Sequence, residues 1–220
     1  MLTTEQMLDE YAVKRVRQVW AFARDHGEWD TMRACFHPGA TVRVAWYSGP
    51  VEGFIKETIE GAADRAPGEG TKHWIGNSRA WVRGDRALLE TDAQVLGRQR
   101  FAGHKFDFTL YIRFYDKLER RQVEWRILRM DAIYDRDRLD PVLAGTLPPG
   151  FFDGVDFSGP QAVLALLKWR MAKRRGKLPD DLPLGGTESE KQLRAEGEAW
   201  LAAGRSEGTE WRERAASAEG

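Results

Sequence analysis

The sequence predicts an α+β fold in which helices precede a long antiparallel β-meander. Apolar residues recur at helical spacing through the first third of the chain, and four strand-like runs follow a Pro/Gly-rich break at 66–70. With 42% hydrophobic and 11% aromatic residues, the 220-residue chain can bury a sizeable core. We therefore expect a cone-shaped α+β barrel, in which a strongly curved antiparallel sheet wraps around the N-terminal helices and encloses one cavity.

Three helices are expected before the main sheet. The first begins at Thr3 or Thr4 and ends near 25–27, and its apolar stripe comprises Leu8, Ala12, Val16, Val19 and Ala23. A short second helix runs from 29 to about 36 and stops at the His-Pro-Gly sequence 37–39. A strand over 41–47, turned by 48–50, leads to a third helix at 51–63.

The strand-like runs lie at 71–83, 87–101, 104–116 and 122–135, and Gly84-Asp85 joins the first two as a tight hairpin. In the third run, Phe106, Phe108, Leu110, Ile112 and Phe114 alternate with residues that include Tyr111 and Tyr115. Both faces of this strand therefore carry bulky side chains. We expect the core on one face and a partner subunit of a homo-oligomer on the other.

The last third of the chain differs in composition, which divides the protein into a cone domain at 1–135 and a helical C-terminal extension at 136–220. The extension bends at Pro148-Pro149-Gly150 and contains helices near 160–175 and 187–203. Its large apolar side chains, such as Phe151 and Trp169, are too costly to leave in water. The extension should therefore pack on the cone or on a neighbouring subunit. Residues 139–157 could cover the cavity mouth, or the extension could only staple subunits together.

Several functional classes are disfavoured by composition. The 34 basic and 34 acidic residues cancel, which argues against a nucleic-acid-binding protein. No apolar run reaches membrane-span length and no signal sequence is evident, so we expect a soluble, cytoplasmic protein without membrane association. The single cysteine, the scattered histidines and the absence of nucleotide-binding glycine motifs predict neither a metal nor a cofactor.

His73 and Asp25 are the candidate catalytic pair. His73 occupies an early strand position whose side chain should face the cavity, although such a histidine is more often a hydrogen-bonded core residue. Asp25 closes the first helix, where the negative end of the helix dipole disfavours a carboxylate and so suggests a compensating partner. A carboxylate beside an imidazole orients the ring and makes it a general base. Sequence spacing alone does not show that the two residues meet.

Three motifs resemble those of a known family. Residues 25–32, DHGEWDTM, resemble the Asp-x-x-x-Trp-Asp-x-Leu that ends the first helix in SnoaL-like proteins of the nuclear transport factor 2-like superfamily. Residues 73–79, HWIGNSR, resemble the His-Phe-Ile-Gly-x-Thr-Arg strand of scytalone dehydratase. Residues 125–127, WRI, resemble the start of the family's last strand. The resemblance covers about residues 5–135.

The resemblance implies a cofactor-independent lyase. In scytalone dehydratase and the related hexachlorocyclohexane dehydrochlorinases, an aspartate and a histidine at these positions form a dyad. By that resemblance, His73 would remove a proton from carbon, Asp25 would orient it, and the neighbouring carbon would lose water or chloride. Family members are often trimers or dimers, so the expected homo-oligomer is a trimer in preference to a dimer.

The chain also departs from scytalone dehydratase. Arg24 stands where that enzyme has a tyrosine before its aspartate, and Trp46, with Tyr47 adjacent, matches another tyrosine. Its second histidine falls near Arg98 and an asparagine near Tyr111, so scytalone itself is disfavoured as the substrate. The expected substrate-binding residues are Trp46, Tyr47, Arg98, Tyr111 and Arg129, and the last three could stabilise an enolate or leaving group.

The first functional hypothesis is therefore a dehydratase-like or dehydrohalogenase-like elimination from a small hydrophobic substrate, with a cyclic one favoured. Two alternatives remain open at the level of sequence. One is an isomerase or cyclase that returns the proton elsewhere. The other is a non-catalytic module that binds a small ligand, because this fold also hosts proteins without chemistry.

Overall fold

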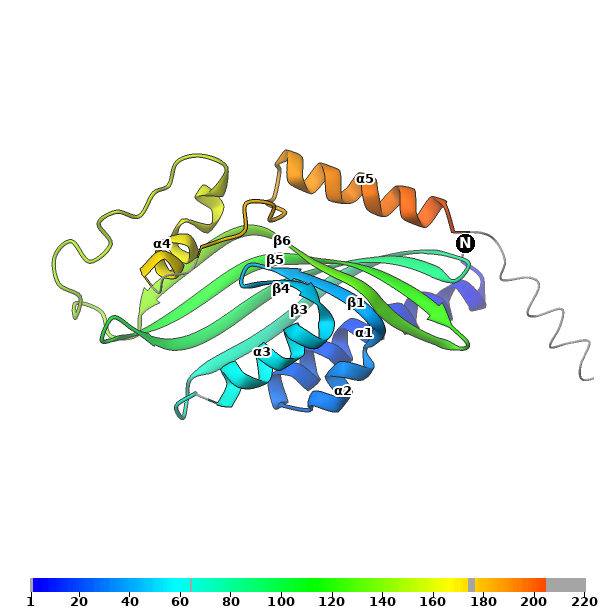
Figure 1. Ribbon diagram of the computed structural model, residues 1–220, viewed down its shortest axis with the longest axis horizontal. Coiled ribbons are helices and arrows are strands. Elements are labelled where there is room, and N and C mark those ends of the chain that lie inside the picture. Colours follow the sequence, from blue (N-terminus) through cyan, green and yellow to red (C-terminus); the bar gives the residue numbers. More distant parts are fainter. Residues whose placement is uncertain (1, 64, 174–176, 205–220) are drawn as a thin grey trace, which may run out of the picture.

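The computed structural model describes residues 2–63, 65–173 and 177–204. Within these ranges, three helices pack against one face of a six-stranded curved sheet with the strand order β2-β1-β6-β5-β4-β3 (Figure 1). The helices are α1 (Thr4–His26), α2 (Trp29–Ala34) and α3 (Val51–Ala63). The strands are β1 (Phe36–Val44), β2 (Tyr47–Pro50), β3 (Gly70–Arg83), β4 (Arg86–Phe101), β5 (His104–Arg121) and β6 (Glu124–Pro141). The expected cone-like α+β fold is confirmed, with a sheet that stays open between its edge strands β2 and β3.

Both ends of α1 are fixed by its sequence. The Thr3 side chain accepts a hydrogen bond from the Gln6 backbone N–H, and the Gln6 side chain accepts one from the Thr3 N–H, which forms a capping box. Gly27 ends the helix at a φ of 73°, a left-handed conformation that glycine adopts without steric cost. Asp25 therefore occupies the last turn of α1, which packs against β3.

The β-meander has the expected order, with longer strands. β3, β4, β5 and β6 pair antiparallel in sequence, and His73 of β3 lies opposite Val95 of β4. On β5, the side chains of Phe106, Ile112 and Phe114 are buried as the alternation predicts. β6 continues to Pro141, six residues beyond the boundary expected at 135.

The structure corrects two expectations about the first strand. β1 begins at Phe36, within the segment expected to end a helix, and residues 48–50 belong to β2 instead of forming the turn. Ala40, Val42 and Val44 are buried at alternate positions, which is the period of a strand and not of a helix. β1 also pairs parallel with β6, so the sheet is mixed and not wholly antiparallel. Pro38 falls at a register shift, where its missing N–H breaks no ladder hydrogen bond.

The C-terminal extension contacts both faces of the sheet. A 3₁₀ turn (Pro160–Leu164) precedes α4 (Ala165–Lys173), which lines a cavity on the inner face, whereas α5 (Glu188–Ala202) lies on the face opposite to α1–α3 (Figure 1). Between them the chain crosses the edge of β6, where the Tyr134 N–H donates to the Pro183 carbonyl and the Gly185 N–H to the Tyr134 carbonyl. Residues 205–220 of the expected extension lie outside the described residues.

The outer face of the sheet is partly covered by α5. Leu193 of this helix packs with Leu88, Tyr115 and Ile133 of the sheet. Arg113 Nη1 also donates to Glu190 Oε1 at 2.6 Å. Burial alone would raise the pKa of Glu190, but hydrogen bonds from Arg113, the Gly186 N–H and Arg194 lower it to about 2. Part of the surface that the sequence led us to assign to a partner subunit is thus occupied by the chain itself.

At the edge of the outer face, Trp74 of β3 is 68% exposed.

Among the described helices, none combines the length and the apolar character needed to cross a bilayer.

Candidate active site

Asp25 and His73 contact each other directly. His73 Nδ1 lies 2.6 Å from Asp25 Oδ1, and the His73 backbone N–H donates to Asp25 Oδ2, also at 2.6 Å. The exposed fractions of the two side chains are only 6% and 3%. The carboxylate that the helix dipole disfavours thus has its compensating partner on β3. One residue from α1 and one from β3, 48 positions apart, form a desolvated pair.

The contact fixes the chemistry of the imidazole. An ionised carboxylate can only accept hydrogen bonds, so Nδ1 carries the proton and Nε2 keeps its lone pair. Burial lowers the pKa of His73, although the Asp25 hydrogen bond opposes this effect, and the neutral ring is favoured. For Asp25, burial would raise the pKa, but the hydrogen bonds from His73 lower it. The pair is therefore a neutral imidazole supported by a carboxylate, the state required of a general base.

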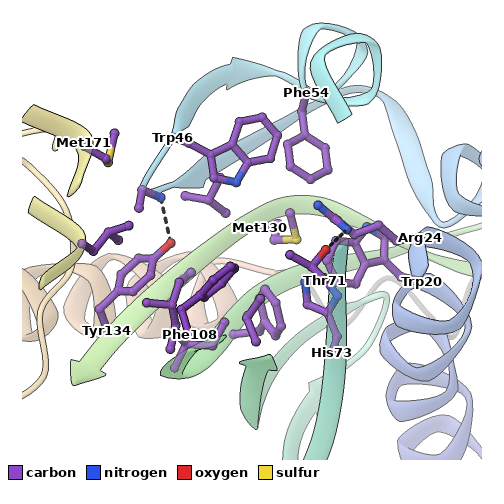
Figure 2. A pocket seen from close by; sticks show the side chains of 18 of the residues that line it. Trp20, Arg24, Trp46, Phe54, Thr71, His73, Phe108, Met130, Tyr134 and Met171 are labelled. Carbon is purple, nitrogen blue, oxygen red and sulfur yellow. Dashed lines mark hydrogen bonds between the residues drawn. The ribbon is translucent and has the colours of Figure 1, made fainter. Parts of the chain in front are cut away.

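His73 lines a cavity of about 340 Å³ between the inner face of the sheet, α1, α3 and α4 (Figure 2). This volume lies at the lower end of the range found for small-molecule sites. The walls are mostly aliphatic and aromatic. The lining residues are Trp20, Arg24, Val44, Ala45, Trp46, Phe54, Thr71, His73, Val95, Phe108, Leu110, Ile112, Phe114, Met130, Ala132, Tyr134, Leu167, Arg170 and Met171.

Aromatic rings hold the imidazole in place. The Trp20 ring meets His73 edge-on at a centroid distance of 5.3 Å, and Phe114 lies 6.3 Å away. Behind them, the fully buried guanidinium of Arg17 lies 4.5 Å from the Trp20 ring centroid and 4.0 Å from that of Phe114. Arg17 is itself paired with buried Asp116. This arrangement restricts the orientation of the candidate base before any ligand arrives.

Arg24 and Thr71 form a second polar group beside His73. Arg24 Nη1 donates to Thr71 Oγ1 at 3.0 Å and lies 4.0 Å from Asp25 Oδ1. Thr71 and His73 are alternate residues of β3, so their side chains project from the same face of the strand. Figure 2 shows Arg24, Thr71 and His73 together on one side of the cavity, opposite Tyr134 and Met171. This end of the cavity is cationic and carries hydrogen-bond donors.

Tyr134 supplies a further polar atom at the opposite side. Its hydroxyl accepts a hydrogen bond from the Ala45 N–H at 2.7 Å, and burial raises the pKa of the phenol. The phenol therefore keeps its proton at neutral pH and can donate it in a hydrogen bond to a ligand.

A family model for the SnoaL-like domain matches residues 5–131. The chain belongs to the SnoaL-like domain family. The match includes both members of the Asp25–His73 pair, and it ends before the C-terminal extension begins.

Individual similarities to this SnoaL-like chain are more distant. Pea pathogenicity protein 2 of Fusarium vanettenii is 28% identical over 145 residues, which cover 64% of the chain and 60% of that relative's length. A scytalone dehydratase candidate from Novosphingobium aromaticivorans has a similar structure, with a TM-score of 0.54 and 18% identity over 62% of this chain and 91% of its own. The structure of LinA gives a TM-score of 0.51 and 20% identity over 65% of this chain and 96% of its own. Both structural similarities support the fold.

Of the expected substrate-binding residues, Trp46 lines the cavity of the SnoaL-like chain and Tyr47 does not. Trp46 is 44% exposed and stacks on Phe54 at a centroid distance of 5.2 Å. The Tyr47 hydroxyl donates to the Pro50 carbonyl, and its ring packs against Trp46 and Phe54. Trp46 thus forms part of the cavity rim, and Tyr47 supports it from behind.

The structure does not bring Arg98, Tyr111 or Arg129 to the cavity, which corrects the expectation that they face the ligand. Arg98 forms a two-point ion pair with Asp107 on the exposed surface. The Tyr111 ring lies on the outer face, with the Arg136 guanidinium 4.1 Å from its centroid. Arg129 pairs with Asp131 on the same outer face.

A β-bulge explains the orientation of Arg129. Ile127 pairs with Leu118 and Arg129 with Lys117, which leaves Leu128 as an extra residue in β6. Before the bulge the side chain of Ile127 faces inward, and after it the inward side chains are those of Met130, Ala132 and Tyr134. Without it, Arg129 would have faced the cavity.

The cavity is covered by α4 and not by residues 139–157. Leu167, Arg170 and Met171 of α4 line it. The 139–157 segment instead packs at the far end of the sheet, where Phe151 and Phe152 join Phe106 and Trp169. Leu167 N–H donates to Asp137 Oδ2 at 2.6 Å, which ties α4 to β6.

In the ranges that the structure describes, no group of three or more His, Cys, Asp or Glu side chains converges in a way that could hold a metal ion.

Sequence reasoning missed three features of the site. They are the buried Arg24, the inward Tyr134 and the cover formed by α4.

Proposed function

We propose that the protein is a cofactor-independent lyase that removes a proton from carbon and expels a leaving group from the neighbouring carbon. The carrying observation is the desolvated His73–Asp25 contact at the wall of an apolar cavity. The resemblance of the aspartate and histidine motifs to those of scytalone dehydratase supports the same assignment. The expected substrate is small and hydrophobic, with a cyclic one favoured, because the walls are mostly apolar.

In the proposed step, the lone pair of His73 Nε2 accepts a proton from an acidic C–H bond. The electron pair of that bond becomes a carbon–carbon double bond, and the leaving group departs from the adjacent carbon with its bonding pair. Asp25 stabilises the imidazolium that forms and holds its Nδ1–H. When the leaving group is hydroxide, the proton on Nε2 can be transferred to it, which releases water and restores the neutral base.

The proposal is tested by mass spectrometry on a panel of hydroxylated and halogenated cyclic ketones in ²H₂O. Elimination predicts a product lighter than the substrate by water or by acid, formed by the wild-type protein. The variant His73→Ala should abolish this product without unfolding the chain, because it removes the proton acceptor and leaves the backbone N–H to Asp25 intact. A matched control is His104→Ala, which changes a histidine in the β4–β5 hairpin outside the cavity.

The alternatives give different results in the same assay. An isomerase or cyclase loses neither water nor acid, so its product is heavier than the substrate only by the deuterium incorporated where the proton returns from solvent. Turnover of a verified substrate by His73→Ala at the wild-type rate would contradict the proposed base. A non-catalytic ligand-binding module would show binding without any His73-dependent product.

A further inference from the structure

We propose that the cavity binds an organic anion, with a ligand carboxylate held by Arg24 and Thr71 beside the imidazole of His73. The inference rests on the proposed function in that it assigns the ligand to the same cavity. It adds the chemical class of that ligand, a small apolar carboxylic acid.

The first argument is the unused hydrogen-bonding capacity of Arg24. Its side chain is only 8% exposed, and a guanidinium has five N–H donors. Within residues 2–63, 65–173 and 177–204, its one hydrogen bond is to Thr71 Oγ1. The Thr71 hydroxyl accepts this bond and retains its own proton, so it too can donate to a ligand. A carboxylate is the acceptor that matches a planar guanidinium with two parallel hydrogen bonds.

The second argument is the sign of the charge around the cavity. Among the described residues, the lining includes Arg24 and Arg170 and no Asp or Glu, and Arg170 lies near Asp137 outside it. Asp25 lies 4.0 Å from Arg24, but its oxygens already accept two hydrogen bonds from His73, and it does not line the cavity. Burial and the nearby Arg65 lower the pKa of Arg24 to about 10 even though Asp25 opposes them. The charge of Arg24 is therefore incompletely compensated in a poorly solvated site, which favours an incoming anion.

The third argument is the position of this charge relative to the candidate base. Asp25 Oδ1 lies 2.6 Å from His73 Nδ1 and 4.0 Å from Arg24 Nη1, so the imidazole and the guanidinium flank the same oxygen. A carboxylate on Arg24 would hold the adjoining hydrocarbon next to the base. The hydrocarbon would then extend along the apolar wall formed by Phe108, Leu110 and Met130 toward Tyr134 (Figure 2).

The test compares two isosteric ligands, 2-naphthoate and 2-naphthamide, which differ in charge. Their dissociation constants for the full chain are measured by calorimetry at pH 7. The wild-type protein should bind the carboxylate about tenfold or more tightly than the amide, as expected for a charge-assisted hydrogen-bonded pair. In Arg24→Met this preference should fall to about one, whereas Arg24→Lys should keep part of it.

The matched control is Arg79→Met, which removes an exposed arginine from the same strand as Thr71 and leaves the cavity unchanged. It should keep the wild-type preference. Thermal unfolding checks that each variant is folded. If Arg24→Met does not fold, Thr71→Val should still reduce the preference several-fold, because it removes one donor and leaves the charge.

Equal affinity of the wild-type protein for the two ligands would overturn the inference. So would failure to bind the carboxylate at millimolar concentration, or an unchanged preference in a folded Arg24→Met. None of these measurements involves turnover. A failed binding test would therefore not contradict the proposed proton abstraction. If the turnover test contradicts proton abstraction, the anion preference is still judged by the binding measurements.

Discussion

At the scale of single residues, Asp25 binds His73 through both carboxylate oxygens, one to the ring and one to the backbone. In Asp25→Asn, one of the two acceptors becomes an NH₂ donor. If that donor meets Nδ1, the ring proton moves to Nε2 and the lone pair is lost from the cavity side. We expect kcat to fall about 10²–10⁴-fold on a verified substrate, with the fold retained. Steady-state kinetics with circular dichroism measures this, and wild-type turnover would contradict the orienting role.

The lowered pKa of His73 predicts how both turnover and the titration of the ring itself depend on pH. Burial lowers this pKa below the ordinary value of about 6.5, with the Asp25 hydrogen bond opposing the shift. The imidazole should therefore be neutral at pH 7, and kcat/KM should fall as the pH drops through the lowered pKa. Because the folded pKa is depressed, the neutral ring's contribution to stability is fully present above the unfolded pKa and is lost as the pH falls through the folded pKa.

Nuclear magnetic resonance of the His73 ring between pH 4 and 8 measures the titration directly, and His73→Ala identifies the resonance. In Asp25→Asn the midpoint of this titration should move to still lower pH, because the carboxylate that raises the pKa of His73 is lost. A midpoint at or above the ordinary histidine value in the wild-type protein would be inconsistent with the burial argument.

At the scale of elements, α4 combines packing in the core with contact to the cavity. Leu167 is 6% exposed and lines the cavity, and its N–H is tied to Asp137. We expect Leu167→Ala to lower the free energy of unfolding by about 2–5 kcal/mol, the range for a buried leucine, and to weaken ligand binding. Urea denaturation and calorimetry measure the two effects.

The matched control is Leu143→Ala, since Leu143 is 68% exposed and lies outside the cavity. It should change neither quantity by more than a small amount. If Leu167→Ala lowers stability but leaves ligand affinity untouched, α4 is a structural cover with no part in binding.

At the scale of the whole molecule, self-association remains the prediction. α5 occupies part of the outer sheet face, but Trp74 at its edge is 68% exposed. We expect this large aromatic side chain to be covered by a second copy of the chain. Multi-angle light scattering at micromolar concentration should give a multiple of 25.1 kDa, with the trimer favoured. Trp74→Ser should shift the distribution toward smaller species, and a 25.1 kDa monomer of the wild-type chain would refute the prediction.

The structural features that could be predicted from the sequence are those that leave a pattern among neighbouring residues. Helical spacing predicted α1 and the full extent of α3, and two motifs singled out Asp25 and His73, which the structure brings together. The alternation in β5 already assigned Tyr111 to the face opposite Phe108. The bulge at Leu128 has no such local signal, so the facing of Arg129 could not be read from spacing.

Tertiary packing decides the remaining features. The apolar stripe expected in the first helix, which began at Leu8, does not mark its buried face, because Leu8 is 63% exposed. Arginine is seldom buried, so composition did not reveal that the buried face of α1 includes Arg17 and Arg24. The path of the extension is equally non-local, because the crossing at Tyr134 and Pro183 joins residues far apart in the chain.

The double contact of Asp25 has a consequence for reading related sequences. The bond to the His73 backbone holds α1 against β3 whatever side chain follows, so selection for folding alone would preserve the aspartate. The imidazole packs against Trp20 and Phe114, but its loss leaves that backbone bond in place. A lineage that had abandoned chemistry would therefore be expected to lose the histidine first and to keep the aspartate. If the proposed base is right, the histidine and not the aspartate should be the informative marker of proton abstraction among homologues.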